Sequence, residues 1–580
     1  MHGFEGTETP AADNSANSTG AWWKELNGYH WFVLIVAALG WLFDTMDQQL
    51  FNLARRPAMQ ELLAPPGGTA NPDDVNFYGG IATMIFLMGW AAGGLGFGIL
   101  GDRIGRAKTM LWTILIYSAF TGLSALSTGF WDFALYRFLT GLGVGGEFAV
   151  GVSLVAEVMP ARARPFALGL LQALSAVGNI TAAVVSIVLF EMEESGAIGS
   201  AWRIMFVIGT LPALLAILIR RRLKEPERWQ SLSDEEMKKK LGSYGELFSP
   251  KWRSNALFGM MLAFSGVVGL WGIGFFSIDL NRSVFEKKLI GDARAAGADK
   301  LDAEFVRAVV HQPALLDDLA AALAADKKSL PQPAALIGPE SGKKDAGALF
   351  GAAVGLQKDK KPVSVEAVLA ALDSAKVPQS SEDRARRAEY LGSPPAEPLA
   401  TDAAKEHALR IGARAKRIGG RIGFWAGVTS IMLNLGAFFG IYAFTYVTHY
   451  TGRRPAFAVA YIAAMFSTAM VFQSLDEFHE IFWMIPLMGF CQLALFGGYA
   501  IYFPELFPTH LRSTGTSFCY NVGRFVAASG PFALGYLTTA VYSASPEPMR
   551  PAGVTMCLVF LLGLMALPFL PETKGKPLPE

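Results

Sequence analysis

The sequence predicts an all-α membrane protein whose twelve transmembrane helices form two pseudo-symmetric six-helix bundles. Of the 580 residues, 52% are hydrophobic, and they gather in uninterrupted blocks. Each block is close to the roughly 20 residues that cross the hydrocarbon core of a bilayer. Six blocks precede a charged stretch and six follow it, and two motifs of the first half recur in the second.

The apolar blocks define the expected domain organisation. They lie at 31–51, 77–99, 109–128, 133–156, 166–190 and 202–219, and then at 255–280, 422–446, 455–474, 481–503, 514–541 and 552–570. We therefore expect a tail (1–30), an N-terminal bundle (31–219), a linker (220–254), a seventh helix (255–280), an insertion (281–420), helices 8–12 (421–571) and a second tail (572–580).

The basic residues of the short loops predict the orientation. Arg103, Arg106 and Lys108 share one side with the basic residues near 162–164, 220–222 and 453–454, whereas the opposite short loops are acidic or neutral. Because cytoplasmic loops retain positive charge, we expect both termini in the cytoplasm and a multi-pass protein of the inner or plasma membrane. The polar N-terminus lacks a basic n-region, so no removable signal peptide is expected.

The insertion between the seventh and eighth helices is expected outside the cytoplasm. It is rich in Ala, Lys and Asp and has few aromatic residues. The stretches ALLDDLAAALAAD and VEAVLAALDSAK have the apolar spacing of helices, which indicates short helices and leaves open a small domain. A flexible segment without a binding role is the alternative. Residues 401–421 favour a helix that continues into the eighth span.

Composition excludes several classes of function. A net charge of +1 gives no basic face for nucleic acid. The three cysteines, Cys491, Cys519 and Cys557, fall inside apolar blocks without the spacing of metal ligands, and no cofactor is expected. No nucleophile with a base and no phosphate-binding loop is evident, so we do not expect an enzyme.

Two motifs reveal an internal repeat. GDRIGRAK follows the second block and HYTGRRP the eighth, while EVMPARAR follows the fourth block and ELFPTHLR the tenth. The offset is 347 positions for the first motif and 348 for the second, which chance rarely produces. The corresponding residues are Gly105 and Gly452, Arg106 and Arg453, Glu157 and Glu505, Pro160 and Pro508, and Arg164 and Arg512.

These motifs carry a resemblance. The segment GILGDRIGR resembles the loop-two signature of the major facilitator superfamily. The Glu-x-x-Pro-x-x-x-Arg elements, KEPERW after the sixth block and PETKG after the twelfth resemble the sugar-porter and organic-acid symporter branches. The resemblance implies two bundles that rock about a central site, usually driven by a proton gradient.

The loop residues suit a conformational latch. Gly98 and Gly105 allow close approach and a tight turn, and Asp102 suits a helix N-terminus or an arginine, in a contact that breaks when the inside opens. The second copy departs from the pattern, with His449 and Tyr450 in place of an Asp-Arg pair. A role in topology alone is the alternative. The expected latch residues are Gly98, Asp102, Arg103, Gly105, Arg106, Glu157, Arg164, Arg453, Glu505 and Arg512.

Four charged residues lie within the predicted spans. Asp44 and Asp47 stand three apart in the first span, and Arg137 and Glu147 lie in the fourth. Each costs roughly 2.5–3.5 kcal/mol at the centre of a span unless it is paired or faces water. Because either aspartate lies at a depth comparable to that of Arg137, we expect a carboxylate–guanidinium pair between the two spans.

Such a pair suggests proton coupling through Asp44, Asp47, Arg137 and Glu147. A protonated aspartate releases the arginine, and the bundle can change state. Proton-coupled sugar porters use such a pair, and Asp44 and Arg137 fall where this resemblance places it. Aromatic-acid symporters have Asp-Gly-x-Asp in this span, and here Thr45 replaces the glycine. An ion pair that only fixes packing, and a packing role for Glu147, are the alternatives.

The residues expected to bind the substrate point to an anion. Arg524 in the eleventh span suits a carboxylate and resembles arginines of organic-acid symporters, although a structural arginine is the alternative. Gln172 matches a sugar-porter position, but the seventh span lacks the paired glutamines of that branch. Trp271 and Tyr520 could stack on a ring, and Asn434 completes the expected set.

We therefore expect a secondary active transporter that moves a small organic anion by proton-coupled alternating access. The expected partners are the solute, protons and the lipid bilayer, with a monomer as the functional unit. A proton-coupled symporter for a neutral sugar or polyol is the first alternative. A non-transporting sensor with the insertion as its ligand domain is the second.

Overall fold

The computed structural model describes residues 21–64, 72–195, 197–230, 241–274, 298–312, 314–325, 362–374, 381–527, 533–545 except Gly535, and 547–579. Single positions between 277 and 292 and between 352 and 356 are also described. Regular structure in these residues is entirely helical, without a strand. The all-α prediction is therefore confirmed.

Every predicted block of the first half lies on a helix. The sixth span differs from the prediction because it consists of two short helices separated by residues 209–212, where a glycine and a proline interrupt the helical pattern. The helices are α1 (Gly28–Leu62), α2 (Pro72–Ile104), α3 (Arg106–Ser124), α4 (Phe130–Val158), α5 (Arg164–Glu194), α6 (Ala201–Ile208) and α7 (Ala213–Arg222).

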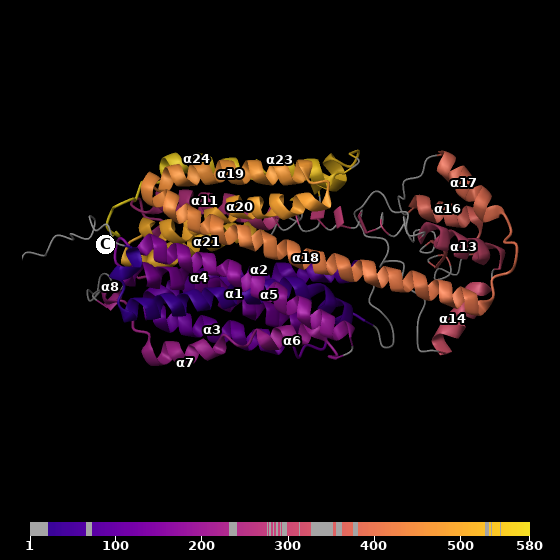
Figure 1. The fold of residues 1–580 in the computed structure, drawn as a ribbon. Coiled ribbons are helices and arrows are strands. Elements are labelled where there is room, and N and C mark those ends of the chain that lie inside the picture. Colours follow the sequence, from indigo (N-terminus) through magenta and orange to yellow (C-terminus); the bar gives the residue numbers. More distant parts are fainter. Residues whose placement is uncertain are drawn as a thin grey trace, which may run out of the picture.

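The second half has the same organisation. Its helices are α11 (Arg253–Val268) followed by a π-helical turn (Gly269–Gly274), α18 (Thr401–Thr451), α19 (Arg453–Ser474), α20 (Ile481–Leu506), α21 (Arg512–Ala527), and α23 (Met549–Met556) with α24 (Val559–Ala566). Among the described residues, eight helices are individually long and apolar enough to cross a membrane. The two halves lie side by side in Figure 1. Short helices α8 (Glu227–Gln230) and α10 (Tyr244–Leu247) lie in the linker.

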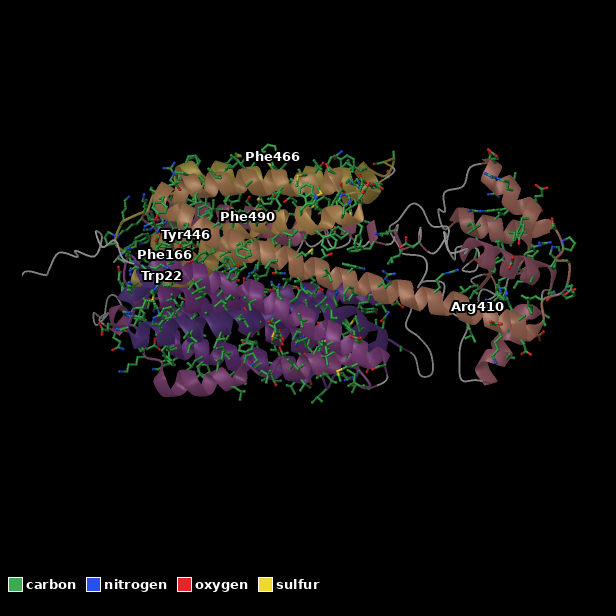
Figure 2. All side chains as sticks on the ribbon, viewed as in Figure 1. Trp22, Phe166, Arg410, Tyr446, Phe466 and Phe490 are labelled. Carbon is green, nitrogen blue, oxygen red and sulfur yellow. The ribbon has the colours of Figure 1, made fainter. Side chains whose placement is uncertain are left out.

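The surface of the bundle is apolar where lipid would cover it. Phe466 on α19 is 65% exposed at the edge of the bundle in Figure 2. Trp131, at the start of α4, is 74% exposed. Large exposed apolar side chains are unfavourable in water, so this surface fits a membrane protein.

The described part of the insertion is a small helical domain at one end of the bundle (Figure 1). It contains α13 (Ala298–His311), α14 (Leu315–Ala325), α16 (Val365–Ser374), α17 (Ser381–Gly392) and the first turns of α18. These helices enclose their own core, which includes Phe305, Val309, Leu319 and Ile411. This core favours a small domain over a flexible segment. Since α18 is continuous, residues 401–421 and the eighth span form one helix.

Glycines let the helices of each half approach closely. A Cβ atom on Gly141 or Gly145 of α4 would collide with backbone atoms of α2, while one on Gly143 would lie 2.6 Å from the Tyr117 nitrogen of α3. Gly141, Gly143 and Gly145 form a ladder along α4 that therefore holds this helix between α2 and α3. In the second half, a Cβ atom on Gly489 of α20 would collide with the Leu433 oxygen of α18.

Substitution of the ladder tests this packing. We expect Gly141→Val to lower the apparent melting temperature of the purified protein by several degrees, because overpacking against a rigid backbone costs about 1–3 kcal/mol or more. Gly151→Val on the same helix is the matched control, since a Cβ atom there meets nothing within 4 Å. Tryptophan fluorescence can follow the unfolding of both variants. Equal melting temperatures would contradict the assigned packing.

Candidate functional site

Asp102 at the end of α2 binds the N-terminus of α21 in the other half. Its carboxylate accepts hydrogen bonds from the backbone nitrogens of Ser513 (3.1 Å) and Thr514 (2.8 Å) and from the Thr514 hydroxyl (2.6 Å). The side chain is fully buried. A carboxylate at a helix N-terminus satisfies free amides and interacts favourably with the helix dipole.

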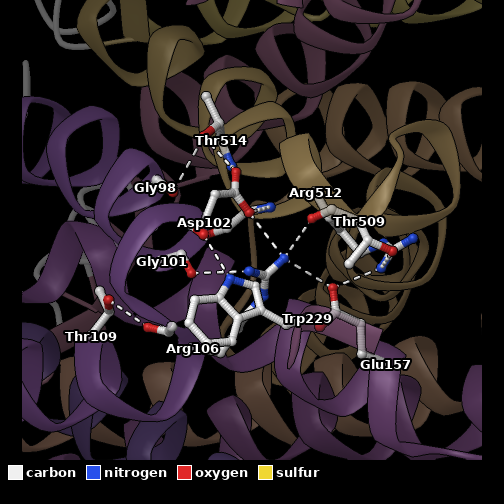
Figure 3. A network of polar contacts seen from close by, with 12 residues as sticks. Gly98, Gly101, Asp102, Arg106, Thr109, Glu157, Trp229, Thr509, Arg512 and Thr514 are labelled. Carbon is white, nitrogen blue, oxygen red and sulfur yellow. Dashed lines mark hydrogen bonds and ion pairs between the residues drawn. The ribbon is translucent and has the colours of Figure 1, made fainter. Parts of the chain in front are cut away.

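Two arginines extend this contact. Arg106 lies 3.0 Å from Asp102 and 3.1 Å from Glu157, and it donates to the Thr509 carbonyl at 2.6 Å. Arg512 lies 2.7 Å from the same Glu157 oxygen. We call Asp102, Arg106, Glu157 and Arg512 the latch cluster, and the end of the bundle that carries it the latch end (Figure 3). The cluster joins α2, α3 and α4 of one half to α21 of the other.

The other expected latch residues have local roles. Gly105 adopts a φ of 110°, which favours glycine, and a Cβ atom on Gly98 would lie 2.6 Å from Cβ of Ser517. Arg103 donates to the Leu241 carbonyl of the linker at 3.2 Å. Arg164 donates to the Ala156 carbonyl at 2.7 Å, within its own half.

The second copy of the motif forms an ion pair within one half. Arg453 contacts Glu505 through two hydrogen bonds, at 2.8 and 3.0 Å. At the position equivalent to Asp102, the His449 ring lies 5.1 Å from the ring of Phe166 on α5. Phe166 lies between Trp22 and Tyr446 in Figure 2, with ring centroids 5.8 and 5.5 Å away. An aromatic contact therefore replaces the charged one.

Two glutamates that the sequence analysis did not select cap helices at the latch end. Glu225 accepts hydrogen bonds from the backbone nitrogens of Ala107 (3.2 Å) and Lys108 (3.1 Å) at the start of α3. Glu572 does the same at the start of α19. Burial raises the pKa of Glu572, but the backbone hydrogen bonds and the Arg453 charge outweigh it, so this pKa lies below its usual value. The two glutamates stand 347 positions apart, so the repeat itself could have identified them.

Asp47 lies beside Arg137 in the middle of the N-terminal half. Their nearest charged atoms are 3.7 Å apart, and both side chains are fully buried. Arg137 also donates to the Ser124 hydroxyl at 2.8 Å and lies 4.5 Å from the Phe206 ring centroid. The sequence alone did not determine whether Asp44 or Asp47 pairs with Arg137, and the resemblance favoured Asp44. Asp47 takes this place because it lies nearly one turn further along α1, towards the end at which α4 carries Arg137.

Asp44 and Glu147 lie nearer the centre of the molecule. Glu147 accepts a hydrogen bond from the Thr113 hydroxyl at 2.7 Å, and its carboxylate lies against Gly40 of α1. Within the described residues, neither carboxylate oxygen of Asp44 has a hydrogen-bond partner. Its charged neighbours are Glu147, Asp47 and Arg524.

A cavity lies between the halves and is lined by residues of both. Arg524 lines it, with its Cζ atom 3.7 Å from the Trp90 ring centroid and 4.3 Å from that of Tyr520. The two rings hold the guanidinium by cation–π contacts. The lining residues are Trp41, Thr45, Gln48, Gln49, Trp90, Gln172, Ser175, Asn179, Leu270, Ser430, Leu433, Asn434, Leu493, Phe496, Tyr520 and Arg524.

The structure places four of the five expected substrate residues around this cavity: Gln172, Asn434, Tyr520 and Arg524. The side chain of Trp271 lies outside the described residues. Sequence reasoning missed Trp41 and Trp90, because periodicity does not distinguish an aromatic residue that faces a cavity from one that faces lipid.

Two amide hydrogen bonds cross the cavity between the halves. Gln49 donates to the Ser430 hydroxyl at 3.1 Å, and Asn179 donates to the Asn434 side-chain oxygen at 2.8 Å. Asn434 is fixed in turn by a hydrogen bond to the Ser430 carbonyl. The halves therefore meet at the cavity as well as at the latch end.

Comparison with known proteins agrees with this architecture. The family profile of the Major Facilitator Superfamily matches residues 32–287. A protein of Haemophilus influenzae named for metabolite transport is 24% identical over 561 residues, which cover 96% of this chain and 99% of that protein. The chain is therefore similar to the major facilitator superfamily. Its apolar helices and these similarities indicate a multi-pass membrane transporter, which is not an enzyme.

Other transporters resemble parts of the chain. The niacin transporter of Acinetobacter baylyi is 32% identical over 197 residues, 34% of this chain and 41% of that protein. The benzoate transport protein of the same organism is 29% identical over 207 residues, 35% of this chain and 41% of that protein. The structure of a proton:xylose symporter shares the fold, with a TM-score of 0.54, 16% identity and coverage of 95% of this chain and 98% of that one.

Loss of the Asp102 carboxylate tests whether the latch cluster holds the halves together. We expect Asp102→Ala to separate the halves at the latch end, since removing one member of a buried charge network costs roughly 3–5 kcal/mol. Double electron–electron resonance between spin labels at positions 108 and 451 should then show a longer distance component.

Glu505→Ala is the matched control, because it breaks the equivalent ion pair inside one half. It should reduce stability without lengthening the distance. An unchanged distance distribution in Asp102→Ala would contradict the role of the latch cluster.

Proposed function

We propose that this transporter moves a small organic anion together with a proton by alternating access. The observation that carries the proposal is the single formal charge on the cavity wall. Among the described lining residues, Arg524 is charged, and the others are apolar, aromatic, amide or hydroxyl side chains. A guanidinium held by two rings can bind a carboxylate through two parallel hydrogen bonds.

The composition of the cavity supports a planar or ring-containing anion. Trp41, Trp90, Phe496 and Tyr520 offer aromatic faces around the arginine. The relatives whose names denote transport of niacin, benzoate and cis,cis-muconate are named for compounds that carry carboxylates. These names support an organic acid as the substrate.

The buried Asp47–Arg137 pair supports proton coupling. An ionised Asp47 is stabilised by Arg137, and its protonation removes that attraction in a region of low dielectric constant. Among the described residues, the remaining contacts of Arg137 are with hydroxyl groups and rings, including Ser124 and Phe206. Loss of this attraction would change the contact between α1 and α4. It would thereby shift the equilibrium between the two conformational states of the carrier.

The latch cluster supplies the second element of the cycle. When it is formed, the halves are held together at the latch end, and a path from the cavity to that side requires its contacts to break. We propose that this end faces the cytoplasm of a cell with the protein in its inner or plasma membrane. We further propose that one chain suffices for transport, since each half supplies part of the cavity.

A neutral sugar or polyol is the second candidate substrate. Gln48, Gln49, Gln172, Asn179 and Asn434 form an amide-rich part of the wall that suits hydroxyl groups. An anionic substrate requires a cation on the cavity wall, whereas a neutral sugar does not. Uptake of a neutral sugar should survive Arg524→Gln, whereas uptake of a carboxylate should not.

Uptake into proteoliposomes tests the proposed function. With benzoate and nicotinate as probes, we expect an inward proton gradient to increase uptake several-fold, and Arg524→Gln to reduce it at least tenfold through loss of a charged hydrogen bond. Asp47→Asn should abolish accumulation driven by the gradient while preserving exchange.

Arg203→Gln is the control, because Arg203 contacts Glu61 at a partly exposed site away from the cavity. Uptake that ignores the pH gradient, or that persists in Arg524→Gln, would contradict a proton-coupled anion transporter. A survey of xylose and other sugars in the same vesicles distinguishes the second candidate.

A further inference from the structure

A row of arginines continues the lipid-facing side of α18 beyond the bundle. The row, which we call the basic stripe, consists of Arg410, Arg414, Arg417 and Arg421. At about 100° per residue, these positions lie within about 40° of one line along the helix. The same line passes through exposed apolar side chains of the eighth span, namely Phe424 (47%), Leu435 (50%) and Phe439 (58%). The basic stripe therefore begins where the apolar surface that lipid would cover ends.

Other sides of α18 carry its contacts with protein. In the insertion, Ala408 and Ile411 are buried in the small core, at about 160° and 100° from this line. In the bundle, Gly440 lies about 120° from the line, and a Cβ atom there would collide with the Phe490 oxygen of α20. The basic stripe faces away from both. Accordingly, the side chain of Arg410 is 64% exposed, and Figure 2 shows it on α18 outside the bundle.

An aromatic cluster lies next to Arg421, the innermost arginine of the stripe. Trp425, one turn further along α18, has its ring centroid 4.7 Å from that of Phe478 and 5.6 Å from that of Phe285. The Lys288 Nζ atom lies 4.3 Å from the Phe478 ring centroid. Two cations from separate segments therefore border one group of rings. Tryptophan rings favour the headgroup level of a bilayer, where such cations meet phosphate.

The positive charge of these two cations is not neutralised within the described part of the chain. Lys288 and Arg421 are both exposed, and neither forms an ion pair with another described residue. The acidic residues beside Phe478 have other partners. Asp476 lies 2.6 Å from Arg550, and the Glu480 carboxylate accepts hydrogen bonds from two backbone nitrogens of its own loop. The cations are therefore available to an anion from outside the chain.

We propose that Lys288, Arg421 and the aromatic cluster between them bind the phosphate group of an anionic phospholipid, whose acyl chains cover the apolar side of α18. A guanidinium forms charge-assisted hydrogen bonds with phosphate oxygens, and an ammonium adds a point charge. The outer arginines of the stripe add attraction at longer range, which salt screens. The site is separate from the cavity, so this inference does not rest on the proposed function.

The lipid also acts on a helix of the cavity wall. Ser430, Leu433 and Asn434 of α18 line the cavity, and the same continuous helix carries Arg421. A headgroup bound at Arg421 therefore holds the end of this helix at the bilayer surface, at the point where α18 leaves the bundle for the insertion (Figure 1).

Quenching of Trp425 by brominated lipid tests the site. The protein has 13 tryptophans, so the Trp425 signal is the difference between the wild type and Trp425→Phe in the same vesicles. Brominated phosphatidylglycerol should quench this signal at a mole fraction about fivefold lower than brominated phosphatidylcholine, because basic residues near the surface attract anionic lipid. Raising the salt concentration should narrow the difference.

Removal of both charges should abolish the preference. In the double variant Lys288→Gln with Arg421→Gln, the two lipids should quench at equal mole fractions, whereas Arg421→Lys should keep most of the preference. The matched control is Arg384→Gln with Arg386→Gln, which removes two exposed arginines from α17 of the insertion and should change nothing. A preference that survives in the first double variant, or that is absent from the wild type, would overturn the proposal.

Inorganic phosphate distinguishes a lipid from a soluble anion of the same chemistry. At equal ionic strength, replacing chloride by phosphate should leave the preference for phosphatidylglycerol unchanged, because the acyl chains hold the lipid at a high local concentration beside α18. Loss of the preference in phosphate at that ionic strength would show that the site takes the soluble anion, and would overturn the assignment to lipid.

Discussion

The constraint on which this structure depends is the cost of charge inside a membrane. Asp44, Asp47, Arg137, Glu147 and Arg524 are all at least 97% buried, and none lies on a surface that lipid would cover. Each would be expelled from hydrocarbon unless another charge, a polar group or water compensates it. The two bundles provide this compensation at their centre, so the positions of the charges and the location of the cavity are consequences of the same requirement. The pairs remain incomplete, because Asp44 has no hydrogen bond and Arg524 has a free Nε atom among the described residues.

Two contacts between the halves follow from the internal repeat and from the positions at which its two copies differ. Asp102 and His449 occupy equivalent positions, yet Asp102 binds the amides of α21 and His449 packs against Phe166 of α5. The charged contact belongs to a buried network that crosses between the halves, whereas the Arg453–Glu505 pair stays inside one half. A duplicated scaffold has thus become asymmetric through a few substitutions. The asymmetry leaves one buried polar contact and one aromatic contact between the halves.

Much of the fold could be predicted because hydrophobic block length and the repeat are properties of the chain itself. The helical spans of the described residues and the helix from Thr401 to Thr451 follow from them, and the repeat also singles out Glu157 and Arg512 of the latch cluster, whose repeat partners are Glu505 and Arg164. Which aspartate pairs with Arg137 could not be predicted, since Asp44 and Asp47 differ by less than one helical turn. The aromatic wall of Trp41 and Trp90 was missed for a similar reason, because residue type does not reveal which face of a buried helix meets the cavity. The broken sixth span depended on Gly209 and Pro212, whose effect the hydropathy pattern concealed.

The central proposal is that the cavity beside these charges belongs to an aqueous path whose exposure switches between the two sides of the membrane. Replacing Gln48 by cysteine in a protein without Cys491, Cys519 and Cys557 places a single thiol on the cavity wall. An impermeant thiol reagent applied to oriented vesicles should label this site from either side, and lowering the pH should change the ratio of the two rates. Labelling from one side alone at every pH, or from neither side, would contradict the account.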